Sequence, residues 1–189
     1  MRRQRNLLGP QGMGGMVSLW GASSMVPSVQ QITWTINAAT VNTTITAVNT
    51  ANAIVVGQGA MSYLGSNNIA VGTVGGLKIT SSTNVQCRRS LAQNFPDLAA
   101  ATVLEFAPGV IRSFQNALIA QTTASTTATI TAVNTAKTFL IVTSDLYSGP
   151  GYQACPRISL TNGTTLTSVV DTYSASYAPE TYIQVVEFF

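Results

Sequence analysis

TITAVNTA, at Thr44–Ala51, occurs a second time in this chain at Thr129–Ala136. Upstream of these copies, Ser28-Val29-Gln30 matches Ser113-Phe114-Gln115 at the same offset of 85 residues, so no gap separates the two matches. Self-similarity at a fixed spacing marks a repeated structural unit. The chain of 189 residues is therefore predicted to contain two similar modules.

A further pair of matching segments indicates where the modules end. Val103–Phe106 (VLEF) matches Val185–Phe188 (VVEF) at an offset of 82 residues, which places a three-residue loop deletion in the second copy. We therefore expect an N-terminal arm at 1–27, modules at 28–106 and 113–189, and a linker at 107–112. Two units are too few for a solenoid, which needs at least about three repeats, so tandem small domains are expected.

Alternation of apolar and polar residues dominates both modules and is typical of half-buried β-strands. Two short apolar runs predict central strands that are buried on both faces. The expected fold class is all-β, with two tandem small antiparallel β-sandwich (or barrel-like) modules preceded by an extended N-terminal arm. The alternating segments are Ile32–Ile36, Thr43–Val48, Ala128–Val133 and Ile158–Leu160, and the apolar runs are Ala53–Val56 and Thr138–Val142.

Turn residues predict one well-defined hairpin. Asn162-Gly163 lies between two strand-like segments and favours a type I′ turn, which needs positive φ at both central positions. The counterpart in the first module is Ser81-Ser82, a weaker turn signal. Ser90–Ala101 is the one helix candidate, and Pro96 limits it to a turn or two.

Charge is scarce and unevenly distributed. Charged residues make up 8% of the chain, against about 25% in ordinary globular proteins, whereas Thr occupies 26 positions. Arg2, Arg3 and Arg5 supply the whole net charge of +3, because basic and acidic residues balance in the remainder. Nucleic acid is not the expected partner, since binding phosphates would require a basic face on the modules.

The arm is expected to anchor the protein to a partner subunit, because termini are ordered only when something holds them. Its anchoring residues are predicted to be Arg2, Arg3, Arg5, Leu7, Leu8 and Trp20. Glycines interrupt the apolar stretch of about 7–15 residues that a signal peptide would need. No apolar run reaches the roughly 18 residues of a transmembrane helix, so no membrane partner is expected.

The sequence offers little for catalysis, and we expect no enzyme, no catalytic residues, no metal site and no cofactor. There is no His, the commonest general base and metal ligand. Asp145 and Asp171 are the nearest approach to a carboxylate pair, and they are far apart in sequence. Cys87 and Cys155 occupy non-equivalent places, which favours two buried reduced thiols over a bridge between modules or subunits.

Two polar residues recur in both modules. Glu105 and Glu187 end the matching VLEF and VVEF segments on strands that are otherwise apolar. They could serve as calcium or partner ligands, but alternation favours a carboxylate on the solvent face of the strand. Asn49 and Asn134 are predicted to be turn residues after a strand.

A possible recognition loop distinguishes the second module. Asp145, Tyr147 and Tyr152 surround a Gly-Pro-Gly turn at 149–151. A Tyr side chain offers a flat face with a polar tip, which suits contact with sugar or protein. Ordinary loop packing is the alternative.

The repeats resemble tandem β-module structural proteins of tailed bacteriophages and prophages. The resemblance covers 28–189, and the first module departs from it at Leu77–Arg89. It implies a non-enzymatic virion protein, assembled in the host bacterial cytoplasm, with capsid, neck or tail proteins and further copies of itself as partners. The segments that carry it are Ser113–Gln115, Thr122–Ala136, Phe139–Val142, Thr161–Thr165 and Val185–Phe188.

Our leading hypothesis is an accessory virion subunit (a fibre, a collar or tail protein, or a capsid decoration) held on the particle by its arm. A symmetric particle implies a homo-oligomer. The alternatives are a carbohydrate- or receptor-binding module, with Tyr147 and Tyr152 against a host-surface glycan, and a secreted bacterial adhesin subunit.

Overall fold

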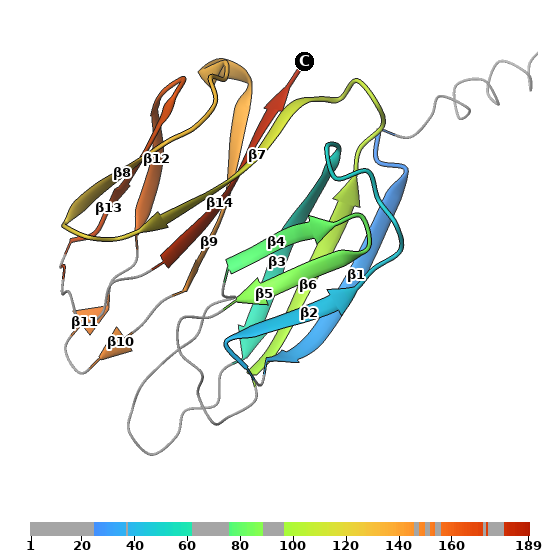
Figure 1. The fold of residues 1–189 in the computed structure, drawn as a ribbon, viewed down its shortest axis with the longest axis horizontal. Helices are drawn as coiled ribbons and strands as arrows, with labels where there is room; N and C mark the ends of the chain where they lie inside the picture. Colours follow the sequence, from blue (N-terminus) through green and yellow to red (C-terminus); the bar gives the residue numbers. More distant parts are fainter. Residues whose placement is uncertain are drawn as a thin grey trace, which may run out of the picture.

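The computed structural model describes residues 25–36, 38–61, 76–88, 97–145, 148–149, 152–153, 156–171, 173 and 180–189. Among these residues all regular structure is β, apart from one 3-10 helix of three residues, which confirms the expected all-β class (Figure 1). The elements are β1 (Ser28–Ile36), β2 (Thr40–Thr44), β3 (Ala53–Met61), β4 (Gly76–Ser81), β5 (Asn84–Arg88), β6 (Asp97–Glu105), β7 (Ile111–Ala120), β8 (Ser125–Thr129), η1 (Thr135–Lys137), β9 (Thr138–Asp145), β10 (Ser148–Gly149), β11 (Tyr152–Gln153), β12 (Arg157–Asn162), β13 (Thr165–Val169) and β14 (Glu180–Phe188).

The strands form two sandwiches with the same topology. In module 1 (β1–β6), the antiparallel sheet β1-β6-β3 faces the sheet β2-β5-β4. In module 2 (β7–β14), β7-β14-β9 and β12-β13-β8 repeat that arrangement, and β10 and β11 form an additional small hairpin. The strand order therefore bears out the duplication that the octapeptide predicted.

Each sandwich has its own core between its two sheets. In module 1 the core includes Val55, Leu77 and Val103, and in module 2 it is built around Leu166 and Ile183. All of these side chains are at most 1% exposed. Fully burying a side chain of this size contributes about 1.5–3 kcal/mol relative to leaving it in water.

The modules also share a third apolar cluster, which joins them. Ile54 and Leu104 of module 1 pack here with Phe114 and Val186 of module 2. The rings of Phe106 and Phe188 meet edge to face, with centroids 6.1 Å apart. As a result β14, the central strand of its sheet, is buried on both faces.

The two apolar runs are edge strands, so the prediction that they are central was wrong. β3 and β9 each lie at the end of a three-stranded sheet. In β3, Ala53 and Val55 are nevertheless buried in the core of module 1, and Ile54 is buried against module 2. In β9 the expected burial fails as well, since Phe139 is 56% and Val142 is 40% exposed.

The hairpin at Asn162-Gly163 is confirmed, but its predicted type I′ geometry is wrong. Among the described glycines only Gly109 has a positive φ, of 84°. Gly163 is needed instead for close approach, since a Cβ there would lie 2.7 Å from the carbonyl oxygen of Val133. The Asn162 Oδ1 atom accepts hydrogen bonds from the Thr164 amide at 2.9 Å and the Thr164 hydroxyl at 3.0 Å.

The helix candidate Ser90–Ala101 was also wrong in its described part. Residues 97–101 belong to β6, where they pair with β1 and β3, whereas residues 90–96 lie outside the described residues. Here sheet packing prevailed over the helical propensity of Leu and Ala. Cys87 is buried in the core of module 1, as expected, and Cys155 lies outside the described residues.

Candidate functional site

The repeated octapeptide carries the chain from one sheet of each sandwich to the other. β2 ends at Thr44 and β8 ends at Thr129, so the alternation beyond those residues does not mark a strand, contrary to our prediction. In module 1 the crossing is held by the amides of Ile45 and Val48, which donate to the Thr83 and Ser82 carbonyls at 2.9 and 2.8 Å.

Module 2 reproduces the same two bonds at the equivalent places. The Ile130 amide donates to the Thr164 carbonyl at 2.9 Å, and the Val133 amide donates to the Gly163 carbonyl at 2.8 Å. In both modules the crossing thus rests on the turn of the opposite hairpin. A segment outside any ladder still satisfies its backbone groups.

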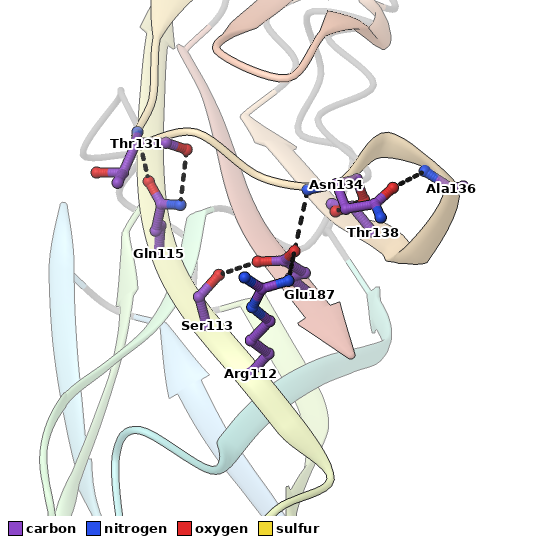
Figure 2. Close-up of polar contacts among 8 residues, drawn as sticks. All are labelled: Arg112, Ser113, Gln115, Thr131, Asn134, Ala136, Thr138 and Glu187. Carbon is purple, nitrogen blue, oxygen red and sulfur yellow. Dashed lines mark hydrogen bonds and ion pairs between the residues drawn. The ribbon is translucent and has the colours of Figure 1, made fainter. Parts of the chain in front are cut away.

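A glutamine side chain grips the middle of each crossing from the first strand of its module. Gln30 accepts from the Thr46 amide at 2.7 Å and donates to the Thr46 carbonyl at 3.0 Å. Gln115 makes the equivalent pair with Thr131, at 2.8 and 3.0 Å (Figure 2). This two-point contact explains why Ser-x-Gln recurs together with the octapeptide.

A glutamate from the last strand of each module holds the end of the crossing. The Asn49 amide donates to Glu105 Oε1 at 2.7 Å, and the Asn134 amide donates to Glu187 Oε1 at 3.0 Å (Figure 2). Glu187 is only 4% exposed, so our preferred interpretation of it as a solvent-facing carboxylate was wrong. The alternation rule failed because the inward face of β14 meets the crossing at this point.

Among the described residues, Glu187 has more partners than Glu105. Ser113 Oγ donates to Glu187 Oε2 at 3.0 Å, and Arg112 lies 3.4 Å from Oε1. The backbone hydrogen bond from Asn134 is the main reason that the pKa of Glu187 lies below its ordinary value of 4.5. Ser113 and the positive charges of Arg112 and Lys137 lower this pKa further, against the opposing effect of burial.

Asn49 and Asn134 are turn residues, as predicted. Asn49 Oδ1 accepts from the Ala51 amide at 3.1 Å, and Asn134 Oδ1 accepts from the Ala136 amide at 3.0 Å. We call the Gln, Glu and Asn contacts to the octapeptide the crossing clamp. The polar side chains that repeat in the sequence therefore bind the backbone of their own module.

Polar contacts also join the two modules. The Gln184 side chain of β14 accepts from the Val55 amide at 2.9 Å and donates to the Val55 carbonyl at 2.6 Å. The Leu77 amide of β4 donates to the Thr143 hydroxyl of β9 at 3.1 Å. The backbones of β3 and β4, on one side of module 1, are thus hydrogen-bonded by side chains of module 2.

The outer part of this junction is aromatic and charged. Arg88 of module 1 forms an ion pair with Glu180 of module 2 at 3.1 Å. Burial raises the pKa of the Tyr182 phenol above its ordinary value, and the neighbouring Glu180 carboxylate adds to that effect. A Cβ on Gly76 would lie 1.9 Å from the Tyr182 ring, so the absence of a side chain at Gly76 gives the ring its place.

The junction also borders an open cleft of about 420 Å³. Hydroxyl and amide groups, the Phe114 ring and two aliphatic side chains line it, and no charged residue does. The lining residues are Thr50, Ala51, Ile79, Thr80, Ser81, Ser82, Phe114 and Asn116.

The residues predicted to act in anchoring and recognition are not brought together in the described structure. Arg2, Arg3, Arg5, Leu7, Leu8, Trp20 and Tyr147 lie outside the described residues. The backbones of Asp145, at the end of β9, and Tyr152, at the start of β11, are described. Sequence reasoning missed Gln184 and Thr143, although a polar residue within a run of buried apolar residues was a signal for Gln184.

Within the described segments, no three or more His, Cys, Asp or Glu side chains form a group that could hold a metal ion. No helix there is long and apolar enough to cross a membrane. Comparisons with models of protein families, with curated proteins and with solved structures each gave no match.

Proposed function

We propose that this chain is a non-enzymatic structural subunit of a virion, of the kind found in tailed bacteriophages, held on the particle by its N-terminal arm. The observation that carries the proposal is the use made of its polar side chains. The crossing clamps and the junction between modules commit Gln30, Gln115, Glu187 and Gln184 to holding backbone in place. Such bonds stabilise a fixed shape, which is what an assembly subunit requires.

The connection to the arm supports this proposal. The Ala107 amide, at the connection between the modules, donates to the Met25 carbonyl at 2.9 Å, and the Phe189 amide donates to the Val110 carbonyl at 3.3 Å. The start of β1, the β6–β7 connection and the C-terminus thus lie at one end of the molecule (Figure 1). An arm that starts here can bind a partner while the rest of both sandwiches remains accessible.

The charge distribution supports it as well. The arm carries three arginines, whereas the balanced modules are poor in charge. A cationic segment followed by Leu7, Leu8 and Trp20 suits an acidic groove with apolar pockets on another subunit.

The experiment is to delete residues 2–24, which keeps Met25, and to follow incorporation in cells that produce the particle. We expect a folded protein with an unchanged thermal unfolding midpoint that is missing from purified particles by immunoblot. Two triple variants refine the result: Arg2, Arg3 and Arg5 to Ala, and Leu7, Leu8 and Trp20 to Ala. Normal incorporation of the deletion variant would contradict the arm as an anchor.

A second candidate function, glycan recognition, is favoured by the β10–β11 hairpin. Its two strands pair Ser148 with Gln153 and Gly149 with Tyr152, and they have no counterpart among the described strands of module 1. Surface loops that differ between the copies of a repeated scaffold often carry recognition. Replacing Tyr147 and Tyr152 by Ala should abolish binding to host cells and leave incorporation intact, and unchanged cell binding would dismiss this candidate.

A further inference from the structure

Two edge strands of this protein are long and nearly free of charge. β1 and β9 each end a three-stranded sheet and have one neighbour among the described strands. β1 (SVQQITWTI) has no charged residue, and β9 (TFLIVTSD) has only Asp145, at its end. Natural proteins usually protect such edges with charges or Pro, because an exposed edge pairs readily with another strand.

The other long edges are protected. β3 is covered by module 2 and hydrogen-bonded by Gln184, and β7 carries Arg112. β4 and β12 carry Lys78 and Arg157. β2 and β8 are uncharged, but they are short and mostly polar, with five residues each. Among the described strands, the least protected long edges are therefore β1 in module 1 and β9 in module 2, where module 1 contacts one face of β9 at Ile141 and Thr143.

Exposed apolar side chains lie on these same two edges. A row across the outer face of the module 1 sheet consists of Val29, Leu104 and Ile54, and the equivalent row in module 2 consists of Phe114, Val186 and Phe139. Four of these six residues pack in the cluster between the modules. The remaining two are Val29 on β1, which is 58% exposed, and Phe139 on β9, which is 56% exposed.

β1 and β9 cannot pair with each other within one chain. β3 is the strand of its sheet that meets module 2, and β1 lies beyond β6 on the far side of module 1 (Figure 1). The partner must therefore come from another molecule. A second copy of this chain offers both edges, so β9 of one copy can pair with β1 of another, and each copy then keeps one free edge for a further copy.

We propose that copies of this chain associate head to tail, with β9 of one copy pairing with β1 of the next. The two sheets then form one continuous sheet across the contact, and Phe139 and Val29 pack side by side on its outer face. Different surfaces meet at each contact, so the association builds a ring where the rotation closes and a filament where it does not. This self-association goes beyond the proposed function and does not require the arm.

The test is the mass in solution, by light scattering over a range of concentrations, of the full chain and of Phe139→Glu and Val29→Glu. We expect the full chain to form oligomers that grow with concentration, and each variant alone to remain at 19.8 kDa. An equimolar mixture of the two should form a complex of twice that mass and no larger, because each variant retains one intact edge. Leu118→Glu, on the protected edge strand β7 and 45% exposed in the parent, is the matched control and should oligomerise normally.

Thermal unfolding followed by circular dichroism checks that each variant is folded. If Phe139→Glu is not, Val142→Lys on the same strand replaces it. A full chain that stays at 19.8 kDa at every concentration, or variants that oligomerise normally, would overturn the proposal. A mixture that remains monomeric would overturn the head-to-tail pairing. The arm deletion distinguishes this contact from anchoring. If the deletion variant no longer joins particles but keeps the same masses in solution, self-association does not depend on the arm, as proposed.

Discussion

β6 and β14 occupy the same position in their modules, yet their surroundings differ. Both are central strands, and their inward residues Val103 and Val185 are fully buried. β14 is also buried on its other face, so that residues 181–187 are all buried. On β6 the outward residues Ala100 and Leu104 remain partly exposed. β14 is thus buried on both faces, whereas the outward face of β6 is still partly exposed to solvent.

The difference is clearest at one pair of equivalent residues. Gln184 on β14 corresponds to Thr102 on β6. Gln184 binds the amide and carbonyl of Val55, whereas the Thr102 hydroxyl is the one buried side-chain polar atom without a hydrogen-bond partner in the described part of the chain. The two strands are equivalent, but only β14 has a buried polar side chain at this position that forms hydrogen bonds.

The largest expected effect concerns the two cores. Leu166→Ala in module 2 should lower the free energy of unfolding by about 2–5 kcal/mol, since a fully buried Leu leaves a cavity. Val85→Ala, at the equivalent position in module 1, should cost less because fewer carbon atoms are removed. Urea unfolding followed by fluorescence and circular dichroism should show a single transition for each, because the junction couples the modules. Two separate transitions would show that the modules unfold independently.

The comparison of Gln184 with Thr102 predicts an intermediate effect. Gln184→Leu leaves the Val55 amide and carbonyl buried without partners, and each such group costs about 1–3 kcal/mol. Thr102→Val removes a hydroxyl that has no partner, so stability should be unchanged or higher. Thermal unfolding of the two variants side by side measures the difference. Equal losses of stability in the two variants would show that the hydrogen bonds from Gln184 to Val55 do not stabilise the fold.

The smallest expected effect is the acid sensitivity of Glu187. Its pKa is lowered in the folded state, so its contribution to stability is complete above its ordinary value of 4.5 and is lost as pH falls through the lowered value. Glu187→Gln should therefore flatten the decline of the unfolding midpoint on acidification. Glu105→Gln leaves Glu187 in place and should retain that decline. An unchanged pH profile in Glu187→Gln would contradict the role assigned to the clamp.

Much of the fold could be predicted from the sequence. The octapeptide and its flanking matches gave two modules, and alternation located most strands. The crossing was misread because Thr44–Ala51 keeps an alternating pattern after the chain has left the sheet. Alternation reports which side chains are buried, and does not report whether neighbouring backbone groups bind a strand or a turn.

The site was less predictable, for a related reason. Residues Ala53–Val56 were interpreted as central because they are apolar, but their second cover is module 2 rather than a second strand. The contact between Gln184 and Val55 joins residues 129 positions apart, and nothing local indicates it. The sequence shows that Glu105 and Glu187 recur. It does not show that each accepts a hydrogen bond from the amide of the Asn in the octapeptide, which only the structure reveals.

The bonds from Gln184 to β3 also bear on how such a protein can evolve. Exchange of domains between genomes works best when each domain folds and stays soluble in isolation. Separating these modules would uncover Ile54 on one product and Val186 on the other. Recombination should therefore transmit the two sandwiches as an inseparable pair, and variation should collect in the arm and the β10–β11 hairpin.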